Sequence, residues 1–329
     1  MPLEPYFQAL QDKIRDVQFT DLIGNPDAIA TFLGAFAPPV GYSPPAGVDI
    51  EDRTVDTPDG GVPIRIYRPA GKVTSGVGLV WAHDGGWASG TIDDPGSHAF
   101  AQEIVHRTRG VVVTIDYRLV SETVRYPAPL DDYAAAYGWV HDHAVELGID
   151  PEHLALGGGG CAANMAVATT LRRRDAGLAL PAALVVPFSL FHHVVPEGTP
   201  EQQEKWQTLA PTTAFNAPMV GFIWMNYTGA PLEHSDDPYL TPAIADLSGL
   251  PRTLIITSEY DHLAPDGEHF ARLLEEAGVD VTYLEESGVQ HAHLNFPWTE
   301  GARRSLDVIA GWLTAPAMAG GATVKAAAR

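Results

Sequence analysis

The sequence predicts an α/β fold built on a doubly wound, mostly parallel sheet. Short continuous apolar runs, such as GVGLVWAH at 76–83 and GVVVTIDY at 110–117, are typical of strands buried on both faces of a parallel sheet. Segments with helical spacing of apolar residues alternate with these runs, and this alternation favours parallel strands joined by helices. The chain has 329 residues, of which 45% are hydrophobic, so it has enough apolar material for one large core.

Eight strands and five helices are expected to form the sheet and the layers that cover it. The first two strands flank the turn PDGG, which is typical of a β-hairpin. The strands are expected at 48–57, 62–70, 76–83, 110–117, 154–160, 182–191, 253–261 and 281–287. The helices are expected at 96–108, 131–145, 163–174, 266–277 and 300–313.

Three segments lie outside this alternation. Residues 1–45 have apolar residues at helical spacing and then a proline-rich stretch, so they are expected to form N-terminal cap helices and a linker. Residues 46–314 are expected to form the main α/β unit. Within it, residues 196–245 are rich in Pro, Trp and Tyr and are interpreted as an inserted cap. Residues 315–329 are small and unpatterned, which predicts a frayed tail.

Composition excludes several classes of function. The net charge of −21 and the pI near 4.8 disfavour nucleic acid or an anionic membrane surface as a partner, because both repel an acidic protein. A single cysteine excludes an internal disulfide and a cysteine metal cluster. The first residues have no basic start or apolar core of a secretory signal, and no apolar run reaches the ~20 residues that span a bilayer. A cytoplasmic location is therefore expected.

Chemistry-bearing residues follow several of the predicted strands, at the edge of the sheet where α/β proteins bind ligands. In HDGGWASG at 83–90, the consecutive Gly85 and Gly86 allow backbone N–H groups to approach a developing oxyanion, although a plain tight turn explains them too. Asp261 ends a later strand, where a helix N-cap is the alternative role. His291 lies in the loop after the next strand. An acid followed by a base in this order is typical of α/β hydrolases.

These motifs resemble those of the hormone-sensitive-lipase-like branch of the α/β-hydrolase fold, a family of carboxylesterases and lipases. HDGGW resembles the H-G-G-G-[FW] oxyanion motif, with Asp84 in place of one glycine. DYRLVSETVRYPAPLDD, EYDHL and GVQHAHLNF are similar to the family's D-Y-R-L-A-P-E…F-P-A-A-L-x-D, E-Y-D-P-L and G-x-x-H-G-F runs, and WMNYTG and DDPYLTPAIADLSGLP match its cap and post-cap pattern. The similarity covers roughly residues 40–313 in unbroken order.

The resemblance implies an α/β-hydrolase fold with an eight-stranded, mostly parallel sheet and a helical cap. It implies that Asp261 is the catalytic acid that orients His291, the base. It further implies that the N–H groups of Gly85, Gly86 and Cys161 form the oxyanion hole. A small, moderately apolar ester or other carbonyl compound is the expected substrate, no cofactor is implied, and a homodimer is compatible with the family.

The segment LGGGGCAANMA at 156–166 departs from the family at the nucleophile. The family's turn between strand and helix reads G-D-S-A-G-G-N-L-A, with the serine as nucleophile. An alignment without gaps, anchored on the Asp150-Pro151 pair and the run 164–166, places Gly160 over the serine. A hydroxyl nucleophile is then absent.

Three interpretations remain open at this point. If the register slips by one residue, Cys161 becomes the nucleophile, since an imidazole can stabilise its thiolate. If the register holds, His291 acts as general base on a water, or on a proton beside a carbonyl as in a lyase or cyclase. In the third interpretation, the protein is a degenerate hydrolase that binds a ligand without chemistry, because glycine suits the strained turn.

Seven further residues are expected to line the substrate pocket: His83, Asp84, Trp87, Phe36, Phe188, Trp224 and His293. Ordinary core packing is the alternative for the aromatic residues among them. A set of His262, His291, His293 and Asp84 lacks the spacing of a metal site. The GGGG run lacks the glycine at position 162 that a dinucleotide fingerprint needs. The sequence thus predicts an esterase-like enzyme with an atypical nucleophile site, without a metal or cofactor.

Overall fold

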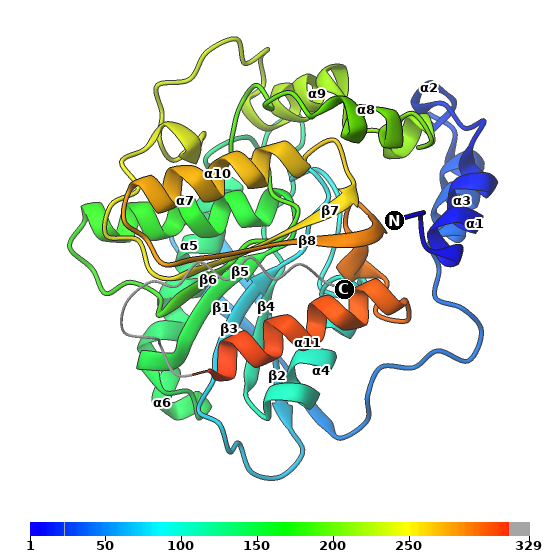
Figure 1. Ribbon diagram of the computed structural model, residues 1–329. Helices are drawn as coiled ribbons and strands as arrows, with labels where there is room; N and C mark the ends of the chain where they lie inside the picture. Colours follow the sequence, from blue (N-terminus) through cyan, green and yellow to red (C-terminus); the bar gives the residue numbers. More distant parts are fainter. Residues whose placement is uncertain (23, 316–329) are drawn as a thin grey trace.

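An eight-stranded sheet runs through the centre of the molecule (Figure 1). The computed structural model describes residues 1–22 and 24–315. The strand order is β1-β2-β4-β3-β5-β6-β7-β8, with antiparallel pairing of β1 with β2 and of β2 with β4, and parallel pairing elsewhere. The strands are β1 (Val48–Thr57), β2 (Gly60–Pro69), β3 (Gly78–Ala82), β4 (Val111–Ile115), β5 (Leu154–Gly158), β6 (Ala183–Val185), β7 (Thr253–Tyr260) and β8 (Val281–Gln290). The predicted doubly wound, mostly parallel sheet is confirmed.

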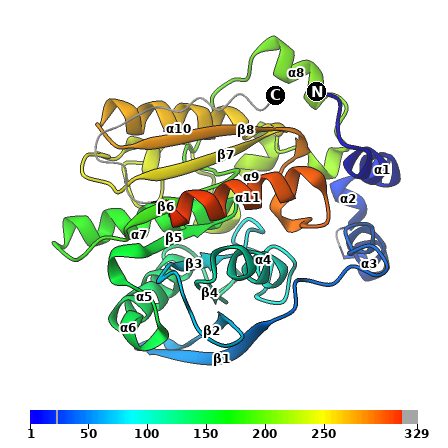
Figure 2. The same cartoon turned by 60° about the horizontal axis from the view of Figure 1, so that its bottom comes forward.

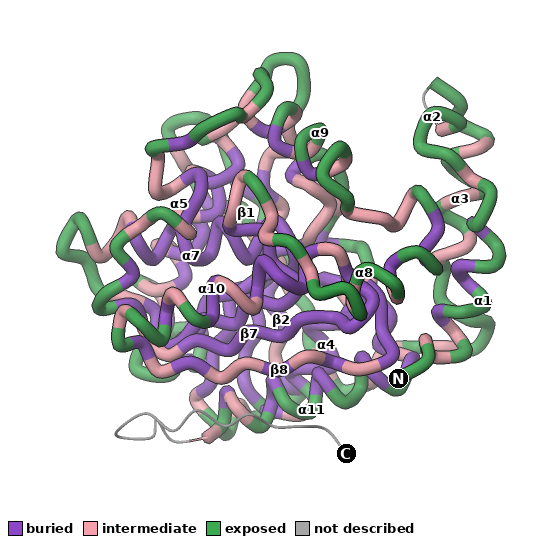
Figure 3. Tube along the Cα trace, turned by 45° about the horizontal axis from the view of Figure 1, so that its top comes forward, coloured by how far each residue is buried: buried purple, intermediate pink, exposed green. Residues whose placement is uncertain are grey.

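Helices cover both faces of this sheet (Figures 1 and 2). On one face, α4 (His98–Thr108) packs against α11 (Glu300–Thr314). The other face is covered by α5 (Ala128–Asp142), α7 (Cys161–Asp175) and α10 (Ala264–Glu276), and the short α6 (Ala144–Leu147) follows α5. Every residue of β3, β4, β5 and β7 is buried, as expected for strands with continuous apolar runs between two helical layers (Figure 3).

Further helices lie beyond the carboxyl ends of the strands. The segment between β6 and β7 contributes α8 (Pro200–Trp206) and α9 (Ala217–Thr228), and the N-terminal segment contributes α1 (Pro5–Ile14), α2 (Phe19–Leu22) and α3 (Pro26–Ala35). Short 3-10 helices occur at Pro151–His153, Pro211–Thr213, Pro242–Ile244 and His293–Asn295.

One glutamine ties the N-terminal helices to the rest of the fold. The amide nitrogen of Gln11 in α1 donates to Gln290 at the end of β8 (2.6 Å), and its amide oxygen accepts from the backbone N–H of Ala210 between α8 and α9 (2.6 Å). Phe7 and Leu10 of the same helix are buried against the loop that follows β8. The base of α1 is thus fixed beside the carboxyl edge of the sheet.

The structure differs from the sequence prediction at β6. The strand expected at 182–191 is only the three residues of β6, because Pro187 has no N–H to donate and Phe188 has a positive φ of 37°. The helical spacing over residues 4–36 corresponds to three helices, α1, α2 and α3. The tail predicted for 315–329 falls almost entirely outside the described residues. In the part of the chain that is described, no helix is both long and apolar enough to cross a membrane.

Candidate active site

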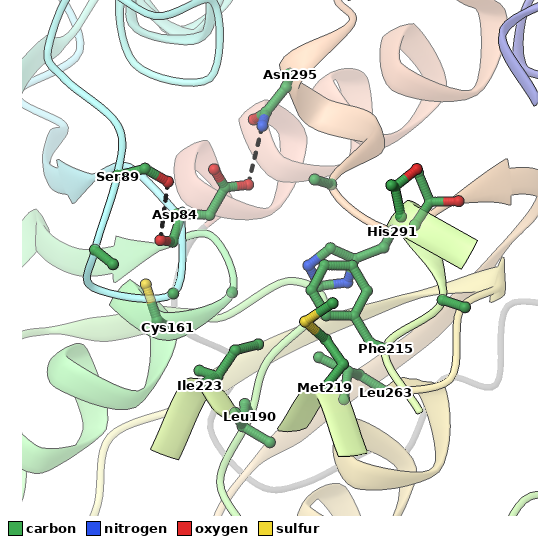
Figure 4. Close-up of a pocket in the computed structure, with 18 of the residues that line it drawn as sticks. Asp84, Ser89, Cys161, Leu190, Phe215, Met219, Ile223, Leu263, His291 and Asn295 are labelled. Carbon is green, nitrogen blue, oxygen red and sulfur yellow. Dashed lines mark hydrogen bonds between the residues drawn. The ribbon is translucent and has the colours of Figure 1, made fainter. Parts of the chain in front are cut away.

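A cavity of about 390 Å³ opens where four loops meet at the carboxyl edge of the sheet (Figure 4). The loops follow β3, β5, β7 and β8, and they carry the residues that the sequence singled out. A volume of this size suits a small organic ligand. Parallel strands end at the same edge, so segments that are far apart in the sequence come together here.

His291 lines this cavity and is hydrogen-bonded to Asp261, which is buried behind it. Nδ1 of His291 lies 2.7 Å from Oδ2 of Asp261, and Oδ1 of Asp261 accepts the backbone N–H of Leu263 at 2.9 Å. The carboxylate is fully buried, whereas the histidine side chain keeps 11% of its surface exposed. Burial lowers the pKa of His291, but the charges of Asp261 and Asp84 and the hydrogen bond from Asp261 outweigh it, so the pKa is raised above 6.5.

Gly160 occupies the tight turn between β5 and α7. Its backbone angles, φ 54° and ψ −116°, lie outside the regions that residues with side chains normally adopt. A Cβ built on Gly160 would lie 3.8 Å from Nε2 of His291 and 3.2 Å from Cβ of Asp84. The free nitrogen of His291 therefore faces a backbone position that carries no side chain.

Cys161, the next residue, is buried on the other side of this turn. Its Sγ accepts the backbone N–H of Trp87 at 3.3 Å and lies 3.7 Å from the hydroxyl of Tyr117. Burial raises the pKa of this thiol to about 12, although the facing N–H groups of Trp87 and Gly86 oppose the shift. A thiol with this pKa is protonated at neutral pH, and the thiolate is the nucleophilic form.

The loop after β3 brings backbone N–H groups to the cavity wall. Gly85, Gly86 and Cys161 all line the cavity. Among the described residues, the N–H groups of Gly85 and Cys161 have no backbone acceptor, so both are available to a ligand. The N–H of Gly86 faces the thiol of Cys161 instead. Gly85 has φ 107°, and a Cβ there would collide with the backbone of Ser89, so this loop conformation requires glycine.

Only two of the seven predicted pocket residues, Asp84 and Phe36, lie in the cavity wall. His83, Trp87, Phe188, Trp224 and His293 are instead packed in the core, with at most 2% of their surface exposed. The ring of Trp87 stacks on Tyr227 (centroids 3.9 Å apart) and that of His83 stacks on Tyr117 (4.4 Å).

Two of the three remaining side chains, His293 and Phe188, contact residues of the site or of the turn after β8. His293 is hydrogen-bonded to Ser258 (2.9 Å) and Ser305 (2.8 Å), which fixes the turn after β8. The ring of Phe188 packs edge-on against His291. The expectation of a direct pocket role was therefore wrong for these five residues, because their side chains are buried in the core instead of lining the cavity.

Most of the cavity wall comes from residues that the sequence analysis did not select. Eight of these residues have a large apolar side chain and come from the N-terminal helices, the segment with α8 and α9, and the strand ends: Phe19, Leu190, Phe215, Met219, Phe222, Ile223, Leu263 and Phe296. Phe215 lies against the ring of His291, with centroids 4.2 Å apart. Asn295, four residues after His291, also lines the cavity. The spacing of aromatic residues in the predicted cap was the one sequence feature that could have indicated these apolar lining residues.

Comparison with known proteins agrees with this geometry. Residues 79–295 match a family described by the alpha/beta hydrolase fold. The chain belongs to this alpha/beta hydrolase family. Carboxylesterase NlhH of Mycobacterium tuberculosis is 36% identical over 254 residues, which covers 75% of this chain and 76% of the relative. An arylesterase of Saccharolobus solfataricus is 32% identical over 255 residues, which covers 76% and 79% of the two chains.

Solved structures show the same fold for this alpha/beta hydrolase. A hyperthermophilic esterase from Pyrobaculum calidifontis superposes with a TM-score of 0.78 at 27% identity, covering 95% of this chain and 98% of the esterase. The family and its relatives make this alpha/beta hydrolase a protein of the carboxylesterase type.

Proposed function

We propose that this alpha/beta hydrolase cleaves a small apolar carboxylic ester by direct attack of a water molecule, without an acyl-enzyme intermediate. The observation that carries the proposal is that the His291–Asp261 pair is intact while the residue that it faces, Gly160, has no side chain. The carboxylesterase and arylesterase relatives support an ester as the substrate class. The apolar wall of the cavity supports a substrate with an apolar acyl or alcohol group.

The proposed mechanism gives each group one role. Nε2 of His291 removes a proton from a water that occupies the space above Gly160, and Asp261 orients the imidazole and stabilises the imidazolium. The N–H groups of Gly85 and Cys161 stabilise the oxyanion, with Gly86 shaping the loop. Sites that lack their nucleophile can still accelerate a reaction on the order of 10³–10⁴-fold over water through such groups.

The proposal predicts that no covalent acyl-enzyme intermediate forms, and this can be tested directly. Hydrolysis of p-nitrophenyl butyrate is expected to proceed linearly without a burst of nitrophenolate. Intact-protein mass spectrometry after rapid quenching is expected to show no butyryl adduct, and paraoxon, which phosphorylates serine nucleophiles, should leave the protein unmodified. A stoichiometric burst with a mass shift would overturn direct hydrolysis. Tight binding of the ester without turnover would instead favour a ligand-binding protein.

Cys161→Ala is expected to leave turnover within about threefold of the wild type, equivalent to less than ~0.7 kcal/mol in activation free energy. The reason is that the thiol is protonated and its sulfur faces Trp87 rather than His291. Steady-state kcat/KM for p-nitrophenyl butyrate measures the effect. The cysteine-esterase interpretation predicts the opposite result, loss of nearly all activity together with loss of inactivation by iodoacetamide.

Activity is expected to fall on the acid side as His291 becomes protonated. A general base must be neutral, so a raised pKa moves the acid limb of the kcat/KM profile to a midpoint above 6.5. The charged and titratable groups near His291 are Asp261, Asp84, His262 and His293. Asp261→Asn should move the midpoint downward, because it removes the largest attraction for the proton. A wild-type midpoint below 6.5 would contradict this role of His291.

A further inference from the structure

The side chain of Asp84 is an ionisable group in the cavity that the proposed mechanism does not use. It follows β3 directly and stands where related oxyanion motifs have a glycine. Its Cβ lies 3.2 Å from the position that a Cβ on Gly160 would take, so Asp84 and His291 flank the same point of the cavity (Figure 4). Because Gly160 has no side chain, Cβ of Asp84 can lie this close to the turn.

One neighbour holds the carboxyl group in place. Nδ2 of Asn295 donates to Oδ2 of Asp84 at 2.9 Å. The side-chain amide of Asn295 packs closely against Gly96, and a side chain at position 96 would collide with it. Within the described residues, Oδ1 of Asp84 accepts no hydrogen bond from protein. The carboxyl group is thus oriented through one oxygen, and the other remains for a ligand.

The surroundings of Asp84 favour its protonated form. Burial raises the pKa of Asp84, and Asp94 adds to this effect, whereas His291, His83 and the hydrogen bond from Asn295 oppose it. Tyr117 and Cys161 also face it, and burial raises the pKa of both, so neither carries charge near neutral pH. In its protonated form Asp84 has no charge that would raise the pKa of His291, so Asp261 alone then opposes the effect of burial on that histidine.

We infer that Asp84 is the general acid of this site and protonates the leaving alcohol while His291 deprotonates the attacking water. The inference rests on the proposed function. The water oxygen bonds to the ester carbonyl carbon as its proton passes to Nε2 of His291. The bond from that carbon to the alcohol oxygen then breaks, and the carboxylic acid of Asp84 gives its proton to this oxygen. The proton on His291 finally returns to Asp84, so that ester and water become acid and alcohol.

Two separate groups suit this reaction because the attacking water and the leaving oxygen are different substituents of one carbon. Asp84 and His291 reach the space above Gly160 from different loops, those after β3 and β8. A positioned acid or base contributes about 10²–10⁴-fold when its proton is needed in the transition state. The contribution of an acid depends on the leaving group, since a good leaving group departs as an anion without a proton.

The test therefore compares two butyrate esters. Asp84→Asn is expected to lower kcat/KM for ethyl butyrate by about 100-fold but that for p-nitrophenyl butyrate by no more than about threefold. Asn295→Ala, which releases the carboxyl group from its partner, should show a smaller effect with the same dependence on the leaving group. Asp93→Asn is the matched control, because Asp93 belongs to the same loop and is exposed. It should leave both esters unchanged.

The possible results distinguish failure of the inference about Asp84 from failure of the proposed function. Equal losses on the two esters, or no loss on either, would overturn the role of Asp84. If His291→Ala is inactive at the same time, the proposed function stands and only this inference fails. A wild type that turns over neither ester would overturn the proposed function and the inference with it. Circular dichroism and thermal unfolding of each variant establish that the fold is retained.

Discussion

His291→Ala is expected to lose on the order of 10³-fold in kcat/KM for p-nitrophenyl butyrate, because it removes the general base. Asp261 and the proposed oxyanion donors would remain in place, but no other histidine lines the cavity among the residues that the structure describes. The side chain lies at the cavity wall, so truncation widens the cavity more than it disturbs the core. Steady-state kinetics, with thermal unfolding of the same preparation, measure the effect.

The matched control for this variant is His262→Ala. His262 is the residue after Asp261, and its ring stacks on Trp206 and lines a second cavity. Removing it deletes an imidazole of the same size near the same loop without touching the proposed base. Activity is expected to stay within about threefold of the wild type. Unchanged turnover in His291→Ala, or an equal loss in His262→Ala, would contradict the assignment of His291.

The sheet and the His–Asp pair could be predicted from the sequence because both depend on local patterns. Continuous apolar runs mark strands such as β3 and β4, and the ends of parallel strands converge wherever they lie in the chain. Asp261 and His291 each follow such a strand directly, so their proximity follows from topology. In the structure, Nδ1 of His291 lies 2.7 Å from Oδ2 of Asp261.

The register of the turn after β5 could not be decided from the sequence. Gly159, Gly160 and Cys161 are all small, so both registers satisfy the close packing of strand and helix. In the structure, contacts with other parts of the chain position this turn. The N–H of Gly160 donates to the backbone oxygen of Pro187 at 3.2 Å, and Sγ of Cys161 accepts the N–H of Trp87. Pro187 and Trp87 lie in loops after other strands, and nothing in the sequence pattern predicts that these loops contact the turn after β5.

The hydrogen bond between Asp84 and Asn295 could not be predicted from the sequence either, because 211 positions separate the two residues. For the aromatic residues, the sequence cannot tell which side of a strand end faces the cavity. Trp87 therefore counted as a pocket residue although it stacks on Tyr227 in the core. Residues 215–223 of the predicted cap supply much of the wall, yet their contact with His291 depends on how that cap folds back.

The double variant D84G/G160S is expected to convert the site to covalent acyl transfer. It restores a serine hydroxyl within reach of His291 and removes the side chain that occupies the neighbouring space. The expected gain in kcat/KM for p-nitrophenyl butyrate is on the order of 10²–10³-fold, since an intact nucleophile, base and acid act as a unit. A burst of nitrophenolate and stoichiometric labelling by paraoxon should appear together with the gain.

The single variants separate the two causes of this change. In G160S, a Cβ at 3.2 Å from Cβ of Asp84 is too close for an ordinary contact, so the hydroxyl is displaced and the gain should be smaller than in the double variant. D84G alone supplies no nucleophile and should remain unlabelled by paraoxon. D84G/G160A fills the same volume without a hydroxyl, and labelling of it would refute the serine as the reacting group. If D84G/G160S is folded but stays unlabelled, His291 is not placed to activate a hydroxyl at this turn, and the direct-water mechanism loses its base as well.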